Sequence, residues 1–192
     1  MNFLAHVYLS GTNTPLAIGN LIADRVKGKS VHHLSPQIQT GVYLHRAIDE
    51  YTDQHPIFRK CVSKLFPTYR HYSRVIIDMY FDHFLAANWD HFHDIPLEEF
   101  SNNFYKKLEL EAPNFSQPIQ KFIHALICYN WFIHYKSVSG LRKILEQMEQ
   151  RTSFPSNLAA SIEDLNQNYS YFENHFFQFM QELITFTKTK NS

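Results

Sequence analysis

The sequence contains little glycine, five residues in 192. A β-rich domain of this length needs many tight turns, and glycine supplies most of their special backbone angles. Long stretches between the eight prolines also lack any helix breaker, so the sequence favours an all-α fold. The only two cysteines, Cys61 and Cys128, have no metal-ligand spacing. Their scarcity excludes a disulfide-stapled domain and a closed thiolate zinc site, and favours a reducing compartment.

Net charge and long apolar runs are also absent. Eighteen basic and eighteen acidic residues cancel, so no overall field attracts the protein to nucleic acid or to an anionic membrane. The most apolar later stretch, residues 122–135, is interrupted by polar side chains and is too short to cross a bilayer. The N-terminus lacks the basic region and cleavage site of a signal peptide. We therefore expect a cytoplasmic protein without a nucleic-acid or membrane partner.

The aromatic content is high, with 17 Phe and 11 Tyr, which excludes a disordered chain. The length fits one domain covering residues 1–192, with residues 187–192 as a frayed tail. Proline and capping residues divide this single-domain helical bundle into about eight helices. The expected helices cover residues 14–28, 37–53, a short segment after Pro56, 69–89, 97–110, 119–134, 138–150 and 157–186.

Two carboxylates in one expected helix form the strongest candidate site. Asp78 and Asp82 are four residues apart, which places their Cβ atoms about 5 to 6 Å apart on one helical face. Their neighbours in the sequence are nearly all apolar, so this helix is expected to be buried. Two buried carboxylates this close do not both stay ionised without a compensating cation. The pair therefore predicts a divalent metal ion.

Three further pairs of polar residues share the four-residue spacing. We expect all four pairs to converge on one site, whose carboxylate and imidazole groups suit Mn²⁺, Fe²⁺ or Mg²⁺. A hydrogen-bonded structural role is the alternative for each pair taken alone. The three further pairs are Asn2 and His6, Asn20 and Asp24, and His45 and Asp49.

Motifs for nucleophilic catalysis are missing. The chain has no Gly-x-Ser-x-Gly sequence, no Gly-rich phosphate loop and no convincing pairing of cysteine with histidine. An enzyme built on this sequence is therefore expected to use water activated by a metal ion.

Four sequence blocks, in order, resemble the acyl carrier protein phosphodiesterase family. They are NFLAHVYL at the start, GNLIAD followed by Gly28, HRAID followed by TD, and a block ending in DHFLAANW. Their order and spacing agree from residue 2 to about 90, and the later half is similar in its helical layout. The family is regarded as a divergent branch of the all-helical His-Asp metal phosphohydrolases. Here the adjacent pair runs in reverse, as Asp82-His83.

The resemblance implies an enzyme that removes 4′-phosphopantetheine from holo acyl carrier protein, with Mn²⁺ as the expected ion. It implies that a catalytic histidine protonates the departing serine oxygen. Arg46, the arginine of the HRAID block, is a candidate clamp for the phosphate, because its planar fork suits paired oxygens. The implied metal ligands are Asp24, Asp49, Asp78, Asp82 and His83, and the implied catalytic histidines are His6, His45 and His83.

Basic residues are concentrated between residues 21 and 75, which hold nine basic and four acidic side chains. Arg25, Lys27 and Lys29 follow Asp24 directly, where they would guide an acidic carrier protein to the metal. An ordinary solvated surface is the alternative interpretation of this clustering.

Two other functions remain open at this stage. One keeps the metal site and changes the substrate to a nucleotide or another small phosphodiester. The other is a non-catalytic helical binding protein, in which the acidic and histidine residues form buried hydrogen-bonded networks. The sequence does not indicate an oligomeric state.

Overall fold

A computed structural model describes residues 2–152 and 156–190 and confirms the all-α class. Within these residues the chain forms eleven α-helices and no strand, more helices than the eight expected. The α-helices are α1 (Phe3–Leu9), α2 (Thr14–Ile22), α3 (Pro36–Gln54), α4 (Pro56–Tyr69), α5 (Tyr72–Ala87), α6 (Leu97–Glu111), α7 (Gln117–Cys128), α8 (Trp131–His134), α9 (Val138–Glu149), α10 (Ser161–Gln167) and α11 (Tyr169–Lys190). Four 3₁₀ helices join them: η1 (Ala23–Arg25), η2 (Gly28–His33), η3 (Trp89–His91) and η4 (Ala112–Asn114).

Local backbone conformation explains why several helices begin or end at other residues than the sequence predicted. Pro67 does not open a helix but lies in the last turn of α4, and the chain turns at Arg70, whose φ is +50°. Asn130 adopts the left-handed conformation and divides the expected helix 119–134 into α7 and α8. The expected helix 157–186 divides into α10 and α11. Residues 187–190, expected to fray, continue α11, and Thr187 is buried. Residues 191–192 lie outside the described residues.

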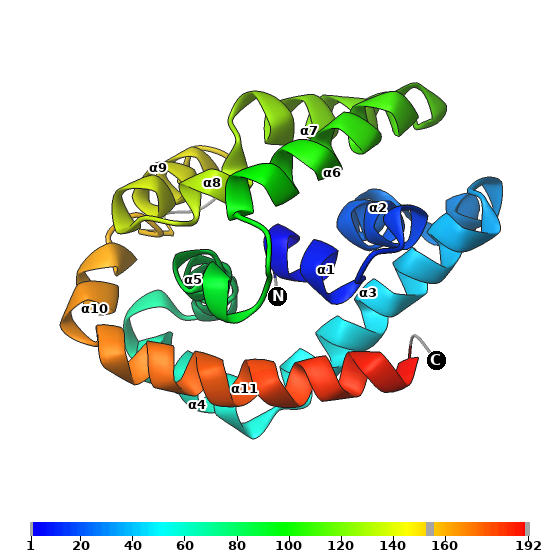
Figure 1. The fold of residues 1–192 in the computed structure, drawn as a ribbon. Helices are drawn as coiled ribbons and strands as arrows, with labels where there is room; N and C mark the ends of the chain where they lie inside the picture. Colours follow the sequence, from blue (N-terminus) through cyan, green and yellow to red (C-terminus); the bar gives the residue numbers. More distant parts are fainter. Residues whose placement is uncertain (1, 153–155, 191–192) are drawn as a thin grey trace.

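Helices α1 and α5 lie in the middle of the molecule, with the other helices around them (Figure 1). The sequence of α5 is apolar around most of its circumference, and eleven of its sixteen residues are buried. Such a helix gains stability from packing on every side, which confirms its expected burial. The buried side chains of α5 form one continuous core with those of the surrounding helices.

Two glycines set the distance between α2 and α3. A Cβ atom on Gly19 would lie 2.0 Å from the carbonyl oxygen of Ile38, and one on Gly41 would lie 2.2 Å from that of Leu16. No larger residue fits at either position, because the two backbones are in direct contact. This close approach fixes α3 against the segment that carries Asn20 and Asp24.

Candidate metal centre

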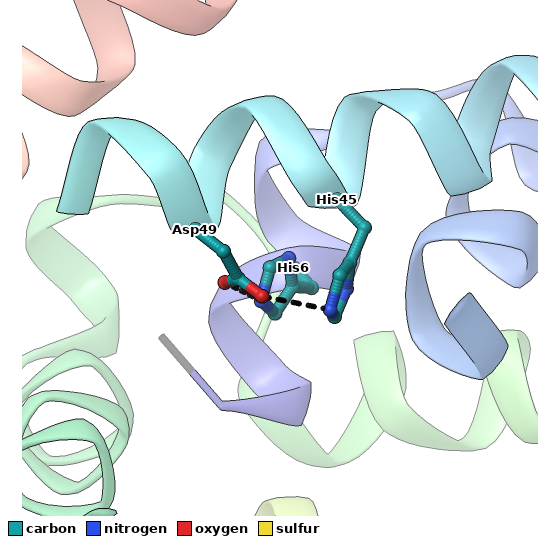
Figure 2. A group of neighbouring side chains, drawn as sticks. All are labelled: His6, His45 and Asp49. Atoms are coloured by element: carbon teal, nitrogen blue, oxygen red, sulfur yellow. Dashed lines mark ion pairs between the residues drawn. The ribbon is translucent and has the colours of Figure 1, made fainter. Parts of the chain in front are cut away.

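Helix α3 presents His45 and Asp49 on one face because they are four residues apart. This face is turned toward α1, from which His6 projects between them (Figure 2). The ligand atoms of the three side chains all lie within 4.8 Å of one another. Among the described residues, no other group of three His, Cys, Asp or Glu side chains meets this condition.

The carboxylate of Asp49 contacts both imidazoles. Its Oδ2 is 3.0 Å from Nε2 of His45, and its Oδ1 is 3.3 Å from Nε2 of His6. The two rings stack with their centroids 4.0 Å apart. Both histidines are buried, whereas the Asp49 side chain is 43% exposed. The cluster therefore reaches the protein surface on the carboxylate side.

Residues from α2 and η1 complete the surroundings of His45. Its Nδ1 donates a hydrogen bond to the carbonyl oxygen of Asn20 at 2.8 Å, and its Nε2 lies 3.2 Å from Oδ1 of Asp24. A backbone carbonyl on one ring nitrogen fixes the tautomer and turns the other nitrogen toward the site, as in metal-binding histidines. The side-chain amide of Asn20 also donates to the carbonyl of His6, which ties α1 to α2.

The charges of the cluster favour a cation. Burial, followed by the charge of His45, lowers the pKa of His6 to about 4. Burial also acts to lower the pKa of His45, but its contacts with Asp24 and Asp49 outweigh this and raise the value to about 9. The hydrogen bond from His45 lowers the pKa of Asp24, and hydrogen bonds from both histidines lower that of Asp49. Two carboxylates thus hold one proton on His45, and a divalent ion would replace it.

The donor set fits a divalent transition metal. Nε2 of His6 is buried and lies 3.3 Å from Oδ1 of Asp49, so it is the ring nitrogen of His6 that faces the cluster and that an ion would meet. Two imidazoles and one or two carboxylates suit Mn²⁺ or Fe²⁺, whereas Mg²⁺ prefers oxygen ligands alone. His6, His45, Asp49 and Asp24 are the residues that would hold the ion.

Asp82, expected to be a metal ligand, has another role in the structure. Its two carboxylate oxygens accept hydrogen bonds from the backbone N–H groups of Leu4 at 2.9 Å and Ala5 at 3.2 Å. These groups belong to the first turn of α1, so Asp82 satisfies backbone donors that the helix leaves unpaired. Burial raises the pKa of Asp82 to about 7, although the two hydrogen bonds act in the opposite direction. Among the described residues, Asp82 is not part of the group whose ligand atoms lie close enough together to share a metal ion.

The other expected ligands on α5 are also separate from the cluster. Nδ1 of His83 donates to the carbonyl oxygen of Tyr135 at 2.7 Å, and its Nε2 lies 3.0 Å from the hydroxyl of Tyr169. These contacts connect α5 to α11 and to the end of α8, so His83 joins helices instead of facing the site. Asp78 lies one turn before Asp82, where burial raises the pKa of its carboxyl, and it is not part of the ligand group.

The expected basic residues lie in different environments. Arg46 is exposed, and its guanidinium carbon lies 5.7 Å from the centroid of the Tyr43 ring. Because Arg46 directly follows His45, it lies beside the helical face that carries His45 and not on it. Arg25 is half-buried, and Lys27 is exposed beyond η1. The side chain of Lys29 lies outside what the structure describes.

Fold and site together define an all-helical protein with a cluster of nitrogen and oxygen donors suited to a divalent cation. A family model described as acyl carrier protein phosphodiesterase matches residues 1–183. The chain belongs to this family, which is one of hydrolases. No helix among the described residues has both the length and the apolar character needed to cross a membrane.

Curated relatives with the same name match over almost the whole chain. A protein named acyl carrier protein phosphodiesterase from Photorhabdus laumondii is 29% identical, and the match covers 100% of this chain and 97% of the relative. One from Pectobacterium atrosepticum is also 29% identical, with 99% of each chain covered. One from Escherichia coli is 29% identical, with 96% of each covered. No solved structure matches this chain.

Proposed function

We propose that this protein hydrolyses the phosphodiester bond that attaches 4′-phosphopantetheine to acyl carrier protein, in the cytoplasm. The products are apo carrier protein and phosphopantetheine. Family membership supports the substrate. The observation that carries the proposed chemistry is the meeting of His6 with His45 and Asp49 from a separate helix.

The residues of the cluster have distinct tasks in this proposal. His6, His45 and Asp49 hold a divalent ion, with Asp24 as a further carboxylate, and Mn²⁺ fits this mixed donor set. A bound ion of this kind supplies a nucleophilic water at neutral pH and neutralises charge on the phosphoryl oxygens. Asn20 keeps Nε2 of His45 directed into the site through its hydrogen bond to Nδ1. The buried imidazoles exclude solvent on one side, and the exposed carboxylates leave the other side open.

The carrier protein is proposed to approach across the surface beyond η1. Carrier proteins are small acidic domains, and the exposed Lys27 lies three residues after Asp24. Attraction between exposed charges is screened by salt. Raising the salt concentration should therefore reduce turnover of holo carrier protein more than turnover of a small phosphodiester. An equal reduction for both substrates would remove the docking surface from the proposal.

The decisive experiment follows the mass of holo carrier protein during incubation with this protein and Mn²⁺. We expect a shift to the mass of the apo form, which disappears with a chelator and in Asp49→Asn. Asp53→Asn is the matched control, since Asp53 lies one turn further along α3 and pairs with Arg74. Turnover of nucleotides but not of carrier protein would support the small-phosphodiester alternative. Failure to bind metal, with the fold intact, would support a binding protein.

A further inference from the structure

Arg25 has an unusual environment. Its guanidinium carbon lies 3.5 Å from the centroid of the Phe122 ring and 5.9 Å from that of Phe3. The side chain is half-buried. Among the described residues, no carboxylate lies within ion-pair distance of this guanidinium, and none of its N–H groups donates a hydrogen bond. A partly desolvated cation is thus held by aromatic rings alone.

Arg74, Arg142 and Arg46 do not combine partial burial with the absence of a carboxylate partner. Arg74 and Arg142 form ion pairs with Asp53 and Glu163. Arg46 stacks on an aromatic ring as Arg25 does, but its side chain is exposed, so water satisfies its N–H groups. Arg25 is only half-buried, and none of its nitrogens is among the fully buried polar atoms of the described residues that lack a partner, so its N–H groups remain open to a ligand.

The position of Arg25 connects it with the metal centre. It directly follows Asp24, whose Oδ1 is 3.2 Å from Nε2 of His45. Phe3, the second ring near the guanidinium, lies three residues before His6 in α1. Phe3 and His6 are therefore on the same side of this helix, about one turn apart. The guanidinium carbon lies over the Phe122 ring, and none of the described residues accepts a hydrogen bond from its N–H groups, so these groups stay available to a ligand.

We propose that Arg25 binds the non-bridging phosphoryl oxygens of the substrate. The planar edge of a guanidinium matches a pair of phosphoryl oxygens, and stacking on Phe122 holds it in place before the substrate arrives. Arg25 is then a catalytic residue that contacts the scissile phosphodiester, and not part of a docking surface as the sequence suggested. This inference rests on the proposed function.

The test compares Arg25→Gln and Arg25→Lys with wild type, and uses Arg142→Gln as the control. Arg142 forms an exposed ion pair, so its removal changes the net charge equally with little effect on stability. Three quantities are measured: bound Mn²⁺ per chain, and kcat/KM for holo carrier protein and for bis(p-nitrophenyl) phosphate. Losing a charged hydrogen-bond donor should lower kcat/KM by roughly 10- to 100-fold for both substrates in Arg25→Gln. Arg25→Lys should retain part of the activity, with unchanged metal content.

Other outcomes would overturn the inference. A loss confined to holo carrier protein would make Arg25 a docking residue, and unchanged rates would leave it a packing residue. Loss of Mn²⁺ would mean that Arg25 acts through Asp24. If the wild type hydrolyses neither substrate, the proposed function fails, but calorimetry with inorganic phosphate still tests Arg25. Phosphate should bind wild type roughly 10- to 100-fold more tightly than Arg25→Gln, and equal affinities would contradict the inference.

Discussion

Replacing Asp82 by Asn should destabilise the fold more than it weakens metal binding. Asp82 accepts hydrogen bonds from two buried backbone N–H groups of α1, those of Leu4 and Ala5. An Asn side chain has one acceptor oxygen, so one of these groups stays unpaired, which costs about 2 kcal/mol. For a domain of this size, such a loss lowers Tm by roughly 4 to 8 °C.

The assay is thermal unfolding followed by circular dichroism at pH 8, with and without Mn²⁺. At this pH the wild-type carboxyl, with a pKa of about 7, is ionised. Helix α1 carries His6, so looser anchoring should weaken Mn²⁺ binding by roughly tenfold at most. Asp94→Asn, an exposed change of the same kind, should leave both quantities unchanged. An unchanged Tm in Asp82→Asn together with complete loss of metal binding would show that Asp82 is a ligand after all.

Four further predictions concern the site and the helices that support it. Asp49→Asn should weaken Mn²⁺ binding, measured by calorimetry, by more than roughly 100-fold, because Asp49 contacts both imidazoles. Mn²⁺ affinity should rise about tenfold per pH unit between pH 7 and 9, because the ion must displace the proton of His45, whose pKa is about 9; a flat profile would contradict this. In the metal-free protein the raised pKa of His45 favours folding below pH 6.5, and this stabilisation is lost as the pH rises through 9. Gly41→Ala should cost about 3 kcal/mol or more in urea unfolding, since the added Cβ meets the backbone of Leu16, whereas Gly11→Ala, with open space but a positive φ, should cost less.

The pattern of residues along the sequence was sufficient to predict the fold class and many of the side chains that form the cluster. Sparse glycine, proline-punctuated helices and an apolar run around residues 75–86 led to an all-α domain with a buried α5, as observed. The four-residue spacing of His45 and Asp49 correctly placed both side chains on one helical face. Each member of the cluster was a candidate, because imidazoles and carboxylates beside apolar residues are unusual in a helix.

Tertiary structure decided which groups each helical face contacts. Asp78 and Asp82 share a helical face, and the sequence predicted that a cation would compensate their charge. In the structure, Asp82 instead accepts hydrogen bonds from backbone N–H groups of a helix almost eighty residues earlier in the chain. No local pattern encodes such a long-range contact. Arg25 and Arg46 likewise follow a site residue directly, and only packing distinguishes the half-buried side chain on Phe122 from the exposed one.

The sequence by itself determined which side chains are available and on which side of a helix they project, because helical geometry depends only on neighbours three and four residues away. Tertiary packing decided which of those sides meet. Gly19 and Gly41 allow the backbones of α2 and α3 to touch, Asp82 anchors α1, and the imidazole of His6 thereby reaches the carboxylate of Asp49.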